Sequence, residues 1–212
     1  NCSDFYQLHL RHTATGQHMA DVLENTAGDT VWAADGKSFF YTLQDGNHRP
    51  LKTFRHKLGT KQEDDVLIHE EKDTGKFSGV SITNSEKWIV ISSHDHDTSE
   101  LWLIDAEKPD ESPRLVAARV AGIEYDLEHW HDRFIIRTNA DDAEDYKLVT
   151  APVSAPGREN WVDLIPHRPG IFIVSHIVMK DWLIRMEREN ALPRIVVRDM
   201  ATGEEHACLL YT

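Results

Sequence analysis

The sequence predicts an all-β fold, a partial β-propeller of about four and a half four-stranded blades. The first observation is a repeat of about 47 residues, because the apolar centres of five strand-like segments follow one another at steps of 46 or 48 residues. The second observation is that helical periodicity is nearly absent. A constant period in this range is typical of propellers, in which each blade is one four-stranded meander. The five apolar centres are Leu8, Phe54, Trp102, Leu148 and Val196.

Short strands joined by polar turns account for nearly the whole chain. A half unit comes first, with strands at residues 6–11 and 18–23. The strands of the four complete units are expected at residues 30–34, 38–43, 51–57 and 65–70; 79–83, 87–92, 100–104 and 114–118; 124–129, 133–138, 146–150 and 161–165; 172–177, 181–186, 194–198 and 206–211. We find no linker and no shift in composition, so residues 1–212 are expected to be one segment of a propeller domain.

Turn residues support this assignment. Asp35-Gly36-Lys37 joins the first two strands of the first complete unit, because Asp-Gly accepts the positive φ of a tight hairpin. Residues 84–86 form the corresponding turn of the second unit. The strings Ala14-Thr15-Gly16-Gln17 and Ala201-Thr202-Gly203-Glu204 echo each other, and both are expected to be hairpin turns with left-handed glycine.

Side-chain patterns within the strands fit stacked blades. The strand at residues 87–92 is apolar on both faces, as expected for a strand covered by a sheet on either side. The strand at residues 65–70 has a short apolar centre between charges, which is typical of an outer strand. The acidic stretch at residues 139–146 is expected to be a solvated loop.

Composition excludes several classes of function. The formal net charge of −13 argues against nucleic-acid binding, which needs a basic surface. We favour solubility as the interpretation of this acidity over the attraction of cationic peptides. No apolar run is long enough to cross a membrane, and no signal peptide is visible. Cys2 and Cys208 lie at opposite ends, so we interpret both as free thiols in a reducing, cytoplasmic compartment.

Two histidine clusters are candidate sites. His94-Asp95-His96-Asp97 has alternating metal-ligand types, but we favour a solvated turn in which these groups satisfy local backbone. His129-Trp130-His131 spans a hairpin turn, and here we favour one histidine packed beside the indole.

Other chemistry-bearing residues have simple structural interpretations. No nucleophile elbow, phosphate loop or dinucleotide fingerprint occurs, and Gly79-Val80-Ser81-Ile82-Thr83 lies in a predicted strand. Trp88 and Trp182 lie two repeat periods apart and are expected to pack between blades. Two acidic groups are interpreted as solvated surface rather than a calcium loop or a catalytic pair; they are Asp141, Asp142, Glu144 and Asp145, and Glu70-Glu71-Lys72-Asp73.

A family resemblance emerges from the order and spacing of short strings along nearly the whole chain. The chain resembles the propeller domain of oligopeptidase B, also called protease II, in the prolyl oligopeptidase family. The matching strings are Val31-Trp32-Ala33, Arg55-His56 with Leu58-Gly59-Thr60, Glu70-Glu71-Lys72-Asp73, Thr98-Ser99-Glu100-Leu101, Glu124-Tyr125, Asp132-Arg133-Phe134, Leu164-Ile165-Pro166 with Arg168, and Asp181-Trp182-Leu183 with Glu187-Arg188.

The resemblance implies a serine peptidase that cleaves short peptides after Arg or Lys. In that family a seven-bladed propeller caps an α/β-hydrolase domain, which carries the catalytic residues and most of the carboxylates that select Arg or Lys. That catalytic domain is absent from this chain and is its expected partner. We therefore assign no catalytic, cofactor-binding or metal-binding residue here, and expect the chain alone to be inactive.

The implied role of the propeller is exclusion, since short peptides reach the active site through its channel or an opening between the domains and folded proteins do not. The first strand of each blade is innermost, so the candidate lining segments are residues 31–34, 80–83, 125–128 and 173–175. Two alternatives stay open: a free-standing propeller that binds a protein partner, and a propeller enzyme with its own metal held by His94, His96 or acidic residues. Because blades are missing, we also expect self-association.

Overall fold

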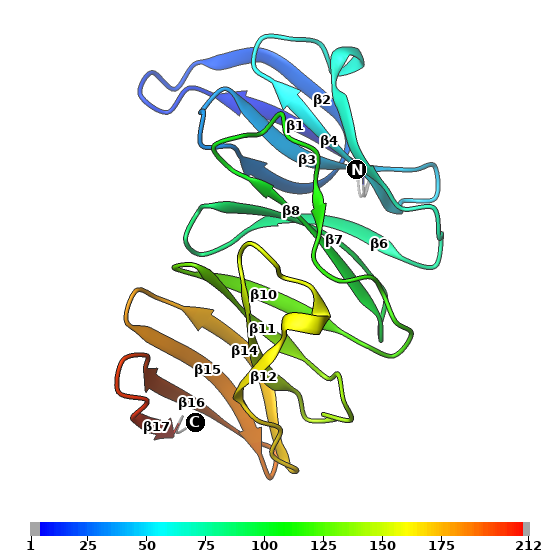
Figure 1. Cartoon of the computed structure of the whole chain (residues 1–212). Helices are drawn as coiled ribbons and strands as arrows, with labels where there is room; N and C mark the ends of the chain where they lie inside the picture. Colours follow the sequence, from blue (N-terminus) through cyan, green and yellow to red (C-terminus); the bar gives the residue numbers. More distant parts are fainter. Residues whose placement is uncertain (1–4, 210–212) are drawn as a thin grey trace. The chain divides into compact units, whose positions relative to one another are not determined.

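The computed structural model describes residues 5–209, so Cys2 and the end of the last predicted strand lie outside the described residues. Within this range the chain forms four antiparallel sheets (Figure 1). The first sheet contains β1 (Tyr6–Arg11), β2 (His18–Trp32), β3 (Ser38–Gln44), β4 (Pro50–Lys57) and β5 (Val66–Glu70). The second contains β6 (Phe77–Ile82), β7 (Trp88–His94), β8 (Ser99–Asp105) and β9 (Arg114–Leu115). The third contains β10 (Tyr125–Trp130), β11 (Arg133–Thr138), β12 (Lys147–Pro152) and β13 (Val162–Ile165). The fourth contains β14 (Ile171–Val178), β15 (Trp182–Glu189), β16 (Leu192–Asp199) and β17 (Glu205–Leu209).

Strand order in every sheet follows the order of the chain, so each sheet is a meander. This confirms the predicted all-β repeat, and each predicted strand has a counterpart. Two short 3₁₀ helices interrupt the strands, η1 (Gln62–Asp64) and η2 (Arg158–Asn160). None of the helices in the described part of the chain is long and apolar enough to span a membrane.

The chain divides into two compact units with separate cores. The first unit holds the residues up to Ile82 together with Glu86–His96 and Leu101–Arg114, and the second holds Thr83–Ser85, Asp97–Glu100 and the residues from Leu115 onward. In the first unit, one core forms around Phe40, Ile89 and Ile91, and another around Leu23, Phe39 and Tyr41. In the second unit the core includes Ile135, Leu148, Ile165, Ile173 and Leu183.

The boundary between the half unit and the first complete unit differs from the prediction. Two strands were expected there, but β2 runs through both, and the first sheet consequently has five strands. The segment between the two expected strands forms an irregularity within β2. Asn25 and Gly28 have φ of 57° and 99°, and the pairing with β3 shifts between Thr26 and Thr30. The Thr26 hydroxyl donates a 3.1 Å hydrogen bond to the Tyr6 carbonyl, which ties this irregularity to β1.

The predicted glycine turns are confirmed. Gly36 has φ of 60°, and the Asp35 carboxylate accepts the N–H groups of Lys37 and Ser38 at 2.8 and 3.0 Å. Gly16 and Gly203 have φ of 70° and 77°. An arginine five residues before each of these two glycines donates to the glycine carbonyl, Arg11 to Gly16 at 2.6 Å and Arg198 to Gly203 at 3.1 Å.

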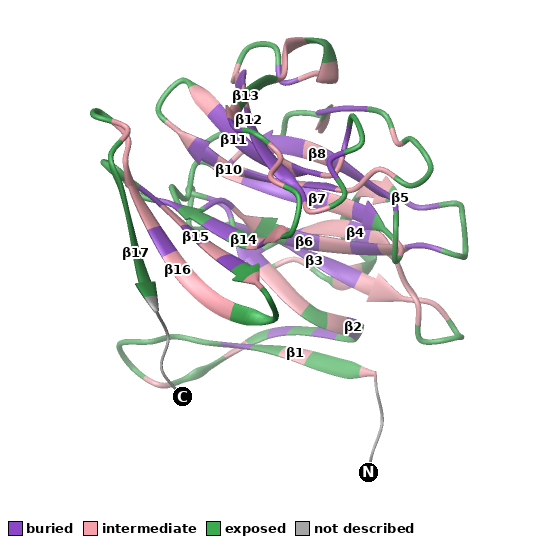
Figure 2. Ribbon diagram, turned by 90° about the horizontal axis from the view of Figure 1, so that it is seen from below, coloured by how far each residue is buried: buried purple, intermediate pink, exposed green. Residues whose placement is uncertain are grey.

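Burial follows the expected pattern across each sheet. Figure 2 shows that buried residues concentrate in inner strands such as β3, β7 and β11, whereas β17 is exposed. In β7, Ile89, Val90 and Ile91 are all buried, as predicted for a strand covered on both faces. β5 is an edge strand of its sheet and leaves Val66 and Leu67 exposed, as predicted for an outer strand.

The fourth sheet has an unusual division between its two faces. Leu183, Arg185 and Glu187 of β15 are buried, whereas Ile184 and Met186 on the opposite face are only half-buried. On that second face Ile184 pairs with Ile177 and Val197 of the neighbouring strands. The buried face therefore contains charge, and the apolar face is partly open.

Candidate functional site

The segments predicted to line a channel lie on the first strand of each complete unit. They fall on or just after β2, β6, β10 and β14, and β6, β10 and β14 are edge strands of their sheets. On β10 the side chains alternate: Tyr125 and Leu127 are buried, whereas Asp126 and Glu128 are half-buried. The edge strand β10 therefore presents two carboxylates, Asp126 and Glu128, on one face of the third sheet.

Asp126 is held by an arginine of the adjacent strand. Arg137 of β11 donates through Nε to Asp126 Oδ2 at 2.7 Å, and its Nη2 lies 2.7 Å from the same oxygen in an ion pair. Its Nη1 donates to the Ile173 carbonyl of β14 at 3.2 Å, and the guanidinium carbon lies 4.3 Å from the centre of the Tyr146 ring. Burial, followed by a hydrogen bond to Glu124, raises the pKa of Tyr146 to about 12, so its hydroxyl stays a proton donor. This cluster links β10, β11 and β14.

His176 of β14 is buried against the same carboxylate. Its Nε2 donates to the Ile135 carbonyl at 3.1 Å, which leaves Nδ1 3.4 Å from Asp126 Oδ1 without a hydrogen bond. Burial lowers the pKa of His176, and the opposing effect of Asp126 does not reverse this direction. The imidazole is therefore neutral near pH 7 and serves as a fixed packing element beside Asp126.

Glu128 is the second carboxylate of β10. Asn84 donates its backbone N–H to Glu128 Oε2 at 2.7 Å, and the Asn84 side chain donates to the Val178 carbonyl at 3.0 Å. Burial raises the pKa of Glu128, and the hydrogen bond from Asn84 only partly opposes this. Asn84 thus positions the Glu128 carboxylate between a turn and the end of β14.

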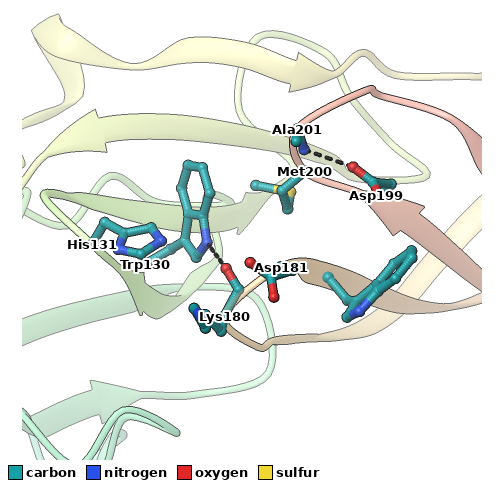
Figure 3. A pocket seen from close by; sticks show the side chains of 8 residues that line it. Trp130, His131, Lys180, Asp181, Asp199, Met200 and Ala201 are labelled. Atoms are coloured by element: carbon teal, nitrogen blue, oxygen red, sulfur yellow. Dashed lines mark hydrogen bonds between the residues drawn. The ribbon is translucent and has the colours of Figure 1, made fainter.

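A separate pocket lies in the second unit, where three hairpin turns meet (Figure 3). Its volume is about 570 Å³. In Figure 3 the Trp130 indole is joined to the Lys180 carbonyl, through a hydrogen bond of 3.0 Å from Nε1. The lining residues are Trp130, His131, Lys180, Asp181, Trp182, Asp199, Met200 and Ala201. We call this hollow the tryptophan pocket.

The first histidine cluster begins at the last residue of β7, His94, and continues into the turn that follows. Asp95 forms an ion pair with Lys76, and Asp97 accepts a 2.8 Å hydrogen bond from Thr98 Oγ1, while His94 and His96 are exposed. Within residues 5–209, no three histidine, cysteine or carboxylate side chains gather in a way that could hold a metal ion. The second cluster has the expected geometry, because the rings of Trp130 and His131 are 4.8 Å apart in a T-shaped arrangement.

Loop carboxylates are engaged in ion pairs and turns. Asp141 bonds Lys147 and Arg158 at 3.2 and 3.1 Å, and hydrogen bonds from these two groups lower the pKa of Asp141. Glu70 pairs with Lys52 at 3.2 Å on the surface. The interpretation of Glu71 as a surface residue is wrong, because its side chain is buried. Its carboxylate accepts hydrogen bonds from the Asp73 N–H at 2.8 Å and from the Ser93 hydroxyl.

The remaining candidate residues lie in strands, and the two tryptophans among them differ in their exposure. Gly79 and Ser81 lie within β6, as predicted. Trp88 is half-buried, and the Arg114 guanidinium lies 5.6 Å from its ring centre. Trp182 differs from the expected packing residue, because it is 40% exposed and lines the tryptophan pocket. The sequence offered no signal for this pocket, since its two indoles are 52 positions apart and come together only through the hairpin turns.

Comparison with known proteins identifies the family. Residues 1–211 match the family described as the prolyl oligopeptidase N-terminal β-propeller domain. The chain belongs to this family. It is 32% identical over 193 residues to dipeptidyl aminopeptidase BI of Pseudoxanthomonas mexicana, covering 91% of this chain and 27% of that protein. It is 33% identical over 200 residues to protease 2 of Moraxella lacunata, covering 93% of this chain and 29% of that protein.

A solved structure supports the same assignment. Oligopeptidase B from Leishmania major matches with a TM-score of 0.90 and 26% identity, over 99% of this chain and 30% of that one. The resemblance to oligopeptidase B and the partial-propeller fold are thereby confirmed. This chain spans less than a third of each of these prolyl oligopeptidase relatives.

Proposed function

We propose that this chain is the non-catalytic propeller part of an oligopeptidase B-like serine endopeptidase, which hydrolyses short peptides after Arg or Lys. The observation that carries the proposal is the match of residues 1–211 to the family's propeller domain, together with the likeness to oligopeptidase B over 99% of the chain. The partner of this chain is then an α/β-hydrolase domain that supplies Ser, Asp and His. Its compartment is reducing and cytoplasmic, in keeping with the exposed free thiol of Cys208.

The contribution of the propeller in this proposal is steric. A rigid array of sheets over an active site admits short, extended peptides and excludes folded proteins. Charge has a second, smaller effect, because the net charge of −13 attracts basic peptides. Selection for Arg or Lys at the cleaved bond belongs chiefly to the catalytic domain.

The gene that encodes this chain gives the first test. The proposal expects the reading frame to continue beyond Thr212 into a Gly-x-Ser-x-Gly motif followed by Asp and then His. A stop codon shortly after Thr212 would favour a free-standing binding propeller instead. The purified 212-residue chain should not hydrolyse a fluorogenic peptide ending in Arg. Hydrolysis at a rate that survives repurification would contradict the non-catalytic assignment.

We further propose that the chain by itself self-associates through the outer face of the fourth sheet. Ile177 and Trp182 are 47% and 40% exposed on this face, and Ile184, Met186 and Ile195 beside them are only half-buried. In the whole protein a following blade would cover these residues. In its absence, a second copy offers the same apolar face.

A further inference from the structure

A histidine of the first unit is buried between two carboxylates. Nδ1 of His56, on β4, lies 2.7 Å from Asp65 Oδ1, and its Nε2 lies 3.1 Å from Asp21 Oδ1. The His56 side chain is 0% exposed, and those of Asp21 and Asp65 are 3% and 1% exposed. The Phe39 ring packs against the imidazole, with 5.0 Å between the ring centres. We call Asp21, His56 and Asp65 the buried trio.

Further donors hold both carboxylates in place. The Gly59 N–H donates to Asp21 Oδ1 at 2.6 Å, and the Tyr41 hydroxyl donates to Asp65 Oδ2 at 2.8 Å. Burial raises the pKa of Asp65, and the hydrogen bonds from Tyr41 and His56 only partly oppose this. Burial would also raise the pKa of Asp21, but the hydrogen bonds from Gly59 and His56 reverse this direction and lower it.

The two nitrogen–oxygen contacts of the buried trio need two hydrogens. A neutral imidazole carries one N–H, and an ionised carboxylate carries none. With only these groups, one ring nitrogen would direct its lone pair at a buried carboxylate oxygen, which is costly without a hydrogen between the two atoms. The geometry therefore requires one additional proton, shared within the buried trio.

We propose that the buried trio is a proton-dependent clasp, which holds β1 and the first part of β2 against the rest of the first sheet while the additional proton is bound. Asp21 lies on β2, whereas His56 lies on β4 and Asp65 directly precedes β5. Release of the proton removes one of the two hydrogen bonds through which the imidazole joins these strands. The inference goes beyond the proposed function, because it involves neither a peptide nor a catalytic domain.

The direction of the pH effect follows from the number of protons bound. Above the ordinary histidine pKa of about 6.5, the unfolded chain carries a neutral histidine and two ionised aspartates. Folding then takes up one proton, so the free energy of unfolding decreases as the pH rises. This contribution raises the unfolding equilibrium constant about tenfold per pH unit between about pH 7 and pH 8.5.

Asp65→Asn separates the contacts from the additional proton. The asparagine amide can donate to His56 Nδ1 while its oxygen accepts the Tyr41 hydroxyl, so the variant needs no additional proton. Urea unfolding of the 212-residue chain measures both proteins. The unfolding constant of the parent, divided by that of the variant, should rise about tenfold per pH unit between about pH 7 and pH 8.5. A ratio that does not change with pH would overturn the proposal.

Two further variants complete the test. His56→Gln has no titrating ring, so it should lose the same pH dependence, although it is less stable than the parent. Asp64→Asn is the matched control, because Asp64 is exposed and outside the buried trio, yet its charge also acts on Asp65. This control should keep the pH dependence of the parent. A loss in Asp64→Asn as large as in Asp65→Asn, or no loss in His56→Gln, would contradict the assignment.

Hydrogen exchange locates the segment that is released. Once the intrinsic effect of pH on exchange is corrected for, peptides from residues 6–23 should lose protection between about pH 7 and pH 8.5 in the parent but not in Asp65→Asn. Peptides from β11, in the second unit, serve as the internal reference. Equal loss of protection in the two segments would contradict a clasp on β1 and β2.

Discussion

Arg185 and Glu187 lie two residues apart on β15 and are joined by a 2.5 Å hydrogen bond, although their side chains are 1% and 0% exposed. Burial alone would raise the pKa of Glu187, but hydrogen bonds from Arg185 and Arg194 reverse this direction and lower it. Arg168 also pairs with Glu187, and Arg185 makes two further bonds to Glu205 at 2.9 and 2.6 Å. One carboxylate thus neutralises part of a concentrated positive charge inside the fourth sheet.

Glu187→Gln should destabilise the chain by about 3–5 kcal/mol, because it removes the fully buried carboxylate that pairs with three arginines and leaves the buried Arg185 with only Glu205 as counter-charge. The matched control is Glu189→Gln, since Glu189 is more exposed and bonds only Arg194. That change should cost less than about 1 kcal/mol. Urea unfolding followed by circular dichroism measures both variants. Similar losses of unfolding free energy in the two variants would show that the burial of Glu187 does not increase its contribution to stability.

His176 gives a prediction for pH dependence. Burial lowers its pKa in the folded chain below the ordinary value of 6.5, so the unfolded chain binds the proton more readily. The contribution of His176 to the free energy of unfolding is therefore complete above about pH 6.5 and decreases as the pH falls through that value. His176→Gln keeps a donor for the Ile135 carbonyl but cannot titrate, so this component of the pH dependence should disappear. If the free energy of unfolding of His176→Gln changed with pH as steeply as that of the parent chain between pH 7 and pH 5.5, the role given to His176 would be contradicted.

Gly203 gives a prediction for turn geometry. Its φ is +77°, and an added Cβ would lie 3.1 Å from the Arg198 guanidinium, which bonds the Gly203 carbonyl. Gly203→Ala should therefore cost about 1–2 kcal/mol. Gly46→Ala is the control, because Gly46 has no neighbour within 4 Å and no positive φ, and it should change stability by less than about 0.5 kcal/mol. Chemical denaturation would contradict the prediction if Gly203→Ala were neutral.

Self-association can be tested on the outer face of the fourth sheet. Ile177→Lys places a charge on this face and should shift the chain from oligomer to monomer in light scattering across a range of concentrations. Val162→Lys is the matched control, because Val162 is 61% exposed on β13 of the third sheet. A monomeric parent chain, or an equal effect of the two changes, would contradict association through this face.

Most of the fold could be predicted because strand period, turn chemistry and repeat length agree with one another. Alternating side chains and turn glycines such as Gly16 and Gly203 depend on local geometry, which a sequence displays directly. The join within β2 could not be predicted, because Asn25 and Gly28 are typical turn residues and only the pairing with β1 and β3 carries the strand through them.

Buried polar networks were less predictable, since they depend on partners distant in sequence. His56 looks like a surface histidine beside Arg55, yet it lies between two carboxylates, with Nδ1 2.7 Å from Asp65 and Nε2 3.1 Å from Asp21. On β15 the alternation suggests Ile184 inside and Arg185 outside, which is the reverse of the structure. Several strings that carry the family resemblance include such positions, among them His56, Glu71 and Glu187.

We propose that this propeller restricts access to a peptidase domain, and the size dependence of hydrolysis by the whole protein tests this proposal most directly. The substrates are nested peptides that share one Arg cleavage site, together with a folded domain that displays the same site in an exposed loop. The account predicts that kcat/KM falls steeply as length increases and that the folded domain is not cleaved. Equal kcat/KM across the series, including the folded domain, would contradict it.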